Sequence, residues 1–430
     1  MNIFSKLLAR IFPKFKNLPR HIQILYWITF FGELYLIIPI WMFFYLRFIT
    51  YEQIALITII QQATAIVLEV PTGAFADIFG KRKTLVISYI FYTISLFLMP
   101  WGNTFIYFAL LEVLKGTAKA LYSGAFEALT YDSLKDEGLE DSYPDISANL
   151  VTVSWIGYIL AGILGGVFYD IWFGLPYVIL SIFYAINIIL LVLFVKEPKI
   201  DTEKVTFSSY VKQNIQGFRE LFTNSKITFL TITLILITLG YYTASELLGI
   251  SQGNQYGLSG TQVGFIFTCG YIISVIMSNI FPKLLKKYKS TSILFSTTSA
   301  LLISFLLAKF VNPILGASLI VLRISSSSTF SNVRSIELNK NISSKNRSTA
   351  LSSFALLYEL GYVAIAYFAG NYIGNHSPND FAFILGAVLL ILILLVQIFS
   401  FIFKKIDNRS YSSPQETHTS KTDSQYTTVS

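Results

Sequence analysis

Long apolar segments recur from residue 22 to residue 403, and they constrain the fold more than any other feature of the chain. A helix needs about 20 apolar residues to cross a bilayer. We therefore predict an all-α polytopic membrane protein. The expected membrane-spanning helices are twelve, at 22–46, 53–76, 84–101, 104–130, 148–169, 173–195, 227–250, 261–282, 291–309, 313–334, 349–373 and 380–403.

Composition and charge placement support this class. Only 13% of the 430 residues are charged, whereas soluble domains carry about 25%. The net charge of +8 could suggest nucleic acid, but nearly all Lys and Arg residues outside the spans fall in segments that we assign to one side. Only Arg47 and Lys309 fall on the other side, and this asymmetry is typical of cytoplasmic loops. The single cysteine, Cys269, excludes a disulfide framework and a multi-cysteine metal site.

The segments divide the chain into five parts. We expect a basic cytoplasmic leader at 1–21, a six-helix half at 22–195, a cytoplasmic linker at 196–226, a second six-helix half at 227–403 and a disordered cytoplasmic tail at 404–430. The leader lies on the anionic inner leaflet. Its following apolar run is too long for a signal peptide, so the first helix is retained. Both termini are expected in the cytoplasm.

The two halves repeat a short pattern at the same depth. Val113-Leu114-Lys115 in the fourth expected helix returns as Val321-Leu322-Arg323 in the tenth. This repeat predicts two pseudo-symmetric halves.

The loop after the second expected helix contains a spaced set of small, acidic and basic residues. Gly73, Asp77, Gly80, Lys81 and Arg82 fit the pattern G-x-x-x-D-x-x-G-[RK]-[RK]. This loop resembles the one between the second and third helices of major facilitator superfamily transporters. The resemblance implies a secondary transporter that works by alternating access and uses a proton gradient instead of a bound cofactor.

The same resemblance assigns roles at the inner face. Asp77 would cap the N-terminus of the eleventh helix, and Lys81 would pair with Asp132 at the end of the fourth. A carboxylate is stable at a helix N-terminus, so this latch would hold an outward-open state. Lys81 stands where the family more often has Arg, and Lys cannot form the bidentate pair, so Arg82 is the alternative partner.

Ionisable residues inside the spans are the candidates for transport. A charge at the bilayer centre costs at least about 2.5–3.5 kcal/mol, so it faces a cavity or a partner. The residues that we assign to the substrate or proton pathway are Glu33, Glu112, Lys115, Arg323, Glu359 and Glu246. The alternative is that they form structural ion pairs between the halves, and Glu112 and Lys115 already share a helix face. Glu69 is a further membrane carboxylate.

Two further patterns bear on direction and substrate. The glycines of the fifth expected helix, Gly157, Gly162, Gly165 and Gly166, resemble an exporter motif, although close helix packing explains them equally well. Glu69 and Pro71 resemble a variant found in tetracycline-efflux relatives. Tyr241 and Tyr242 could stack against a planar cation.

The prediction is a bacterial inner-membrane protein that exports drugs or other small amphipathic molecules in exchange for protons. The alternatives are a proton-coupled importer of a sugar, peptide or other nutrient, and a non-transporting receptor or lipid-handling protein. Its expected partners are a small-molecule substrate, protons and membrane lipids, without nucleic acid, and it is expected to be a monomer. The chain has no P-loop, metal cluster or catalytic triad pattern, so we predict no enzymatic activity, catalytic residue or metal.

Overall fold

The structure, a computed structural model, describes residue 12 and residues 15–198, 215–343 and 347–410. Within these ranges every regular element is a helix. Ten of the described helices are long and apolar enough to cross a membrane. The prediction of an all-α polytopic fold is confirmed. Most of the expected leader, linker and tail lie outside the described residues.

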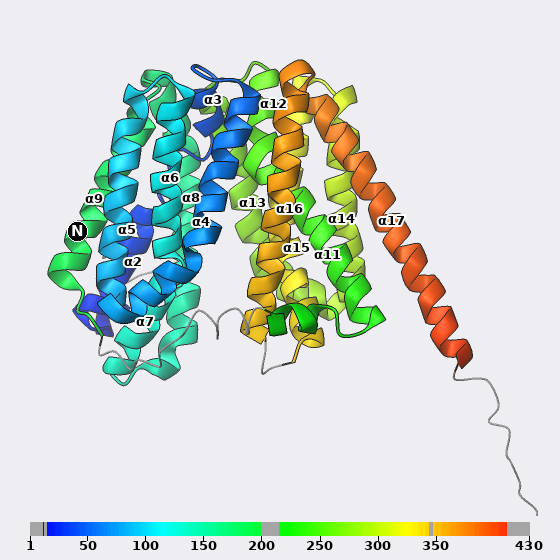
Figure 1. Ribbon diagram of the computed structural model, residues 1–430, viewed down its shortest axis with the longest axis horizontal. Coiled ribbons are helices and arrows are strands. Elements are labelled where there is room, and N and C mark those ends of the chain that lie inside the picture. The colour runs from blue at the N-terminus through cyan, green and yellow to red at the C-terminus, as the bar shows by residue number, and fades with distance from the viewer. Residues whose placement is uncertain (1–11, 13–14, 199–214, 344–346, 411–430) are drawn as a thin grey trace, which may run out of the picture.

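The helices form two successive groups along the chain. The first group contains α2 (Arg20–Glu33), α3 (Trp41–Tyr45), α4 (Tyr51–Phe79), α5 (Lys81–Leu98), α6 (Phe105–Tyr122), α7 (Ala125–Asp136), α8 (Tyr143–Ile171) and α9 (Leu175–Phe194). The second contains α11 (Ser225–Thr243), the π-helix η4 (Ala244–Leu248), α12 (Gly249–Gln255), α13 (Gly260–Lys287), α14 (Ser290–Leu306), α15 (Pro313–Asn341), α16 (Arg347–Asn375) and α17 (Pro378–Ser410). Each group is a bundle, and the two bundles stand side by side (Figure 1).

Corresponding helices in the two halves begin in the same way. Thr50 and Gln53 form a capping box at the start of α4, in which each side chain bonds the backbone of the other residue. Ser259 and Gln262 form the same box at the start of α13. A capping box satisfies two backbone donors that a helix N-terminus leaves free. The two halves therefore share local structure at the starts of these corresponding helices.

Two expected spans are interrupted, which corrects the predicted bounds. In place of one helix at 22–46, α2 ends at Glu33 and α3 begins at Trp41, with Pro39 in the break, because proline removes a helical hydrogen bond and clashes with the preceding turn. The segment at 104–130 is divided at Gly124, whose φ of 72° does not fit a helix. Neither segment is among the ten, so the count of twelve stays a prediction.

Other helix ends differ less. The structure extends α15 to Asn341 and α17 to Ser410, where the sequence predicted ends at residues 334 and 403. Polar residues at these ends do not stop a helix when neither Gly nor Pro interrupts it. The last helix therefore continues seven residues into the expected tail, from residue 404 to Ser410.

The molecule has two ends, which we name by their residues. The basic end contains the sequence Lys81-Arg82-Lys83 and the lysines that close α13, and it is the lower end in Figure 1. The far end contains the last residues of α8 and the first residues of α13.

Candidate functional site

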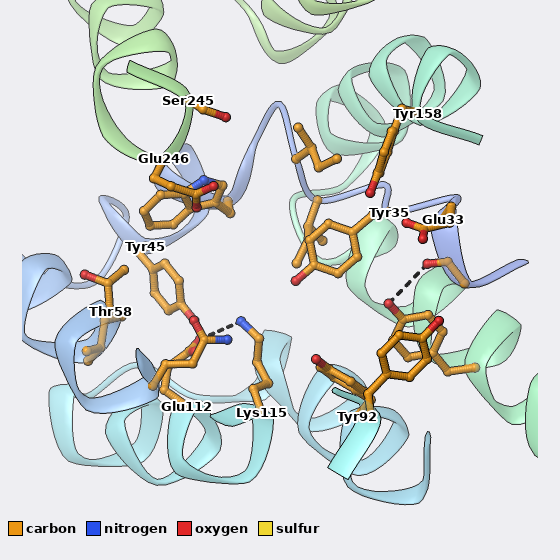
Figure 2. Close-up of a pocket in the computed structure, with 18 of the residues that line it drawn as sticks. Glu33, Tyr35, Tyr45, Thr58, Tyr92, Glu112, Lys115, Tyr158, Ser245 and Glu246 are labelled. Atoms are coloured by element: carbon orange, nitrogen blue, oxygen red, sulfur yellow. Dashed lines mark hydrogen bonds and ion pairs between the residues drawn. The ribbon is translucent and has the colours of Figure 1, made fainter. Parts of the chain in front are cut away.

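A cavity of about 560 Å³ lies between the two halves. Its walls come from the break between α2 and α3 and from α4, α5, α6, α8 and α9 of the first half, and from η4, α13 and α15 of the second. Figure 2 shows side chains from both halves converging on this space. We refer to it as the central cavity.

The break in the first expected helix brings a carboxylate and a tyrosine into the central cavity. Glu33 is the last residue of α2, and Tyr35 follows in the broken segment. The hydroxyls of Tyr158 and Ser154 on α8 interact with the Glu33 carboxylate, and Figure 2 shows Tyr158 directed toward it. Within the described residues, Glu33 forms no salt bridge, so its charge has hydroxyl partners but no cation.

Glu112 and Lys115 of α6 form a neutral pair in the cavity wall. The Lys115 Nζ lies 2.7 Å from Glu112 Oε1, and Tyr45 of α3 donates to the same oxygen at 2.5 Å. Both charged residues are buried. An ion pair of this kind is costly to break, because the remaining partner stays buried with its charge. The alternative of a structural ion pair therefore fits Glu112 and Lys115 better than Glu33.

The π-helix η4 supplies the ionisable side chain that the second half adds to the central cavity. Ala244–Leu248 carries Ser245 and Glu246 into the cavity, on the side opposite Glu33 and Tyr158 (Figure 2). Single π-turns inside α-helices occur frequently at functional sites. Glu246 lies on the cavity wall without a salt bridge to any described residue.

Aromatic side chains form much of the remaining wall. They are Tyr35, Trp41, Tyr45, Tyr89, Tyr92, Tyr122, Trp155, Tyr158, Tyr184 and Tyr271. Aromatic faces attract cations and stack on planar groups. Tyr241 and Tyr242, which the sequence indicated as possible stacking residues, do not line the central cavity. Tyr241 stacks on Phe330 with ring centroids 5.0 Å apart, and Tyr242 packs on Tyr362.

Arg323 lies beside the central cavity, not in its wall. It borders a recess of about 70 Å³ that shares Ser245, Tyr271 and Ser327 with the cavity. Its guanidinium donates to Gln252 of α12 and lies 5.3 Å from the ring centre of Phe305. Arg323 and Lys115, which correspond in the sequence repeat, differ in their partners: Lys115 has a carboxylate and Arg323 has a neutral amide.

Glu359 does not reach the central cavity. It lies on α16 close enough to Glu69 of α4 for the two carboxylates to repel each other, and Lys119 of α6 attracts Glu69. Lys119 also donates to Gln62 at 2.9 Å. These groups lie where the two halves face each other, outside the cavity lining.

A second pocket continues from the central cavity toward the basic end. It has a volume of about 350 Å³ and shares Glu33 and Tyr122 with the cavity. Its other lining residues include Gly124 at the break before α7 and Tyr143 at the start of α8. The two volumes adjoin at Glu33, which places this carboxylate on a path between the cavity and the basic end.

The two halves are joined at the far end. Asp170 of α8 accepts hydrogen bonds from the backbone amides of Gly260 and Thr261, at 3.0 and 2.9 Å. A Cβ atom on Gly166 would lie 2.2 Å from the carbonyl oxygen of Gly260, and one on Gly264 would lie 2.1 Å from that of Gly162. Glycine allows this backbone approach. Gly162 and Gly166 of α8 thus pack the first half against the second, whereas Gly157 and Gly165 pack against Glu33 and Leu36 of the first half.

The loop after α4 is tied to its own half. Lys81 forms an ion pair with Asp132 of α7. The backbone amides of Arg82 and Lys83 donate to the carboxylate of Glu197 at 3.0 and 3.3 Å. Glu197 was not predicted from the sequence, although an acidic residue beside Pro198 after the sixth expected span was the available signal.

Of the remaining motif residues, Gly80 is in close contact with Glu197, whereas Gly73 and Asp77 have few contacts. Gly80 has a φ of 102°, and a Cβ there would lie 2.5 Å from Glu197 Cδ. Asp77 is half-buried and makes no hydrogen bond or ion pair with any residue in the described ranges, and a Cβ on Gly73 would meet no atom within 4 Å. The expected contact of Asp77 with the start of α16 is therefore not seen in this conformation, for the residues that the structure covers.

The known proteins that this chain resembles include transporters. The chain is 23% identical over 287 residues to the uncharacterized MFS-type transporter YxaM of Bacillus subtilis (strain 168), which covers 64% of this chain and 70% of YxaM. It is 23% identical over 214 residues to multidrug resistance protein 1 of the same organism, and this match covers 50% of this chain and 52% of that protein. The fold resembles a crystal structure of a variant of the nucleoside transporter NupG with a TM-score of 0.72 and 16% identity, covering 88% of this chain and 98% of that one.

The family model of the major facilitator superfamily matches residues 22–340, which include the loop motif and the helices that form the central cavity. The protein is therefore a multi-pass membrane transporter of the major facilitator superfamily.

Proposed function

We propose that this transporter exports small amphipathic cations with aromatic character in exchange for protons. The basic end would face the cytoplasm of a bacterial cell, as the placement of its lysines and arginines favours. Substrate would enter the central cavity from that end, and the two halves would then rock about it.

The observation that carries the proposal is a pair of carboxylates without cation partners in an aromatic cavity. Glu33 and Glu246 come from opposite halves, and neither has a salt bridge to a described residue, whereas Glu112 in the same wall is neutralised by Lys115. Buried charges are normally paired. Glu33 and Glu246 are thus suited to hold either protons or a cationic ligand, but not both together.

The position of Glu33 favours it as the proton carrier. It ends α2, and the C-terminus of a helix carries partial negative charge that disfavours a second negative group. It also borders the pocket that leads to the basic end. A cation that binds beside Glu33 would displace its proton, and reprotonation would release the cation after the halves have rocked.

One observation supports export over import: one relative is named a multidrug resistance protein. The pocket that adjoins the central cavity at Glu33 extends toward the basic end, while the halves are bonded at the far end. This conformation would admit substrate from the cytoplasmic side.

A binding experiment with purified full-length protein tests the proposal. Tetraphenylphosphonium would be titrated in weakly buffered detergent solution, with affinity read from tryptophan fluorescence and proton release from a soluble pH dye. We expect binding with proton release in the wild type, and an affinity about tenfold lower in both Glu33→Gln and Glu246→Gln.

Glu140→Gln is the matched control, because Glu140 is exposed and lies outside the cavity. It should bind as the wild type does. Unchanged affinity in both cavity variants, or binding without proton release, would overturn the proposal that these carboxylates exchange protons for a cation.

A further inference from the structure

The second half contains a slot on its outer surface that is separate from the central cavity. α13 and α14 each pack against α15, and side chains of α15 form the floor between them. The slot has a volume of about 600 Å³. Its lining residues are Ile273, Met277, Leu284, Tyr288, Ser292, Ile293, Ser296, Thr297, Ala300, Leu322, Ser325, Ser326 and Thr329.

The slot is apolar in spite of its hydroxyl groups. Thr297 donates to carbonyl oxygens of its own helix at 3.0 and 3.1 Å, and Ser325 and Ser326 donate to Leu322 O at 3.1 and 2.7 Å. Hydroxyls that are bonded to their own helix present mainly carbon to a neighbour. Small side chains such as Ala300 leave the space, and the aliphatic groups of Ile273 and Leu322, both more than a third exposed, form its rim.

The length of the slot matches one leaflet. Along α14 the lining runs from Ser292 to Ala300, which is about 12 Å at 1.5 Å per residue, and along α13 from Tyr288 to Ile273, about 22 Å. The hydrocarbon of one leaflet is about 15 Å thick. The slot therefore begins at the basic end, where α13 ends and α14 begins, and stops near the middle of the membrane.

Four cations lie in sequence near the end of the slot that Tyr288 forms. Lys283, Lys286, Lys287 and Lys289 are all exposed, and no salt bridge joins any of them to a carboxylate in the part of the chain that the structure covers. Lys287 lies 5.3 Å from the ring centre of Tyr288, which itself lines the slot. This end of the slot thus combines apolar lining with lysines that have no carboxylate partner among the described residues.

We propose that this slot binds one anionic phospholipid from the leaflet at the basic end. One acyl chain fills the slot between α13 and α14, and the phosphate lies between Lys287 and Lys289. Basic clusters beside apolar surface between membrane helices recognise anionic headgroups in this way. A zwitterionic lipid would gain the same apolar contact without the net attraction to the lysines.

The test uses full-length protein in detergent, incubated with dioleoylphosphatidylglycerol or dioleoylphosphatidylcholine and analysed by native mass spectrometry. The wild type should retain one phosphatidylglycerol more tightly than phosphatidylcholine. Lys287→Gln/Lys289→Gln should lower phosphatidylglycerol retention about tenfold and bring the two lipids to similar affinity. Ala300→Phe fills the slot and should lower the retention of both lipids.

The controls separate this site from general lipid contact. Lys196→Gln/Lys226→Gln removes two exposed cations that lie outside the slot, and Ile303→Phe enlarges an exposed side chain of α14 that does not line it. Both should retain lipid as the wild type does. Equal retention of the two lipids by the wild type, or unchanged retention in both test variants, would overturn the proposal.

Displacement of the bound lipid by tetraphenylphosphonium, at concentrations that saturate the central cavity, would assign the slot to a transport substrate and would also overturn the proposal. If Ala300→Phe fails to fold, the lysine variant still decides the question, because its substitutions are exposed. Lipid retention in detergent does not require transport. The result of this test is therefore independent of proton exchange at Glu33.

Discussion

The carboxylate of Asp170, at the end of α8, accepts a hydrogen bond of 3.0 Å from the backbone amide of Gly260, the first residue of α13. One half of the transporter thereby caps a helix of the other half. A carboxylate at a helix N-terminus is stabilised by the free amides and by the helix dipole. The contact holds the halves together at the far end and is expected to break when that end opens.

Removal of this cap should shift the protein toward a state that is open at the far end. A hydrogen bond to a charged group contributes about 1.5–3 kcal/mol, so Asp170→Ala should change the ratio of the two states at least about tenfold. Spin labels at Asn103 and Asn312, exposed positions near the far end of each half, would report the change as a longer distance.

Asp380→Ala is the matched control for that experiment. Asp380 also lies at the far end, but it pairs with Lys309 at 2.9 Å inside the second half. Its loss should leave the label distance unchanged. A distance distribution in Asp170→Ala identical to that of the wild type would contradict a closing role for the cap.

Gly166 should be intolerant of any side chain. The methyl group of Gly166→Ala would lie 2.2 Å from the carbonyl oxygen of Gly260, which is far inside van der Waals contact. We expect this variant to fold but to lose most transport, with the far end held open in the label experiment. Gly374→Ala, whose Cβ would meet only a flexible Glu52 side chain at 3.7 Å, should transport normally. Full activity of Gly166→Ala would show that the halves do not need this approach.

The pair of Glu112 and Lys115 should matter for stability. Glu112→Gln keeps the shape of the side chain but leaves Lys115 buried without a counter-charge, which should cost about 3–5 kcal/mol. Glu112→Gln/Lys115→Met removes both charges and should recover most of this loss. Thermal unfolding of the detergent-purified proteins measures both effects. A double variant no more stable than the single one would argue against mutual neutralisation.

Gly80 should tolerate a side chain less well than a second glycine with positive φ. Gly138→Ala places a methyl group at a φ of 66° with no atom within 4 Å, so it should cost only the backbone strain of about 1–2 kcal/mol. Gly80→Ala adopts φ 102° and ψ 148°, a conformation nearly restricted to glycine, and also adds contact with the Glu197 carboxyl group. It should therefore lower the unfolding midpoint more than Gly138→Ala, and equal losses would contradict both constraints.

The sequence predicted the helices, their approximate bounds and the division into halves, because apolar length and the repeat around Lys115 and Arg323 are local signals. It did not predict the break after Glu33. Pro39 was the available signal, and the apolar character of the flanking residues obscured it. The π-helix at Ser245 and Glu246 leaves no distinct pattern, since it depends on how the chain packs around one extra residue.

The candidate site was predicted in part. Charge inside an apolar segment is visible in a sequence, and Glu33, Glu112, Lys115 and Glu246 indeed share the central cavity. Which of them is neutralised depends on rotamers and neighbours in space, as the contrast between Glu112 and Glu33 shows. The chain has 26 tyrosines, and their positions in the sequence alone do not indicate which of them line the cavity.

The most direct test of the proposed exchange uses inside-out vesicles with an acidic lumen and a fluorescent pH probe. On addition of tetraphenylphosphonium, wild-type vesicles should lose protons from the lumen as the cation enters. Glu33→Gln vesicles should not respond, whereas Glu140→Gln vesicles should respond as the wild type does. Absence of proton movement across a panel of amphipathic cations, together with proton-driven nutrient uptake in whole cells, would contradict export and would leave the fold and the family unchanged.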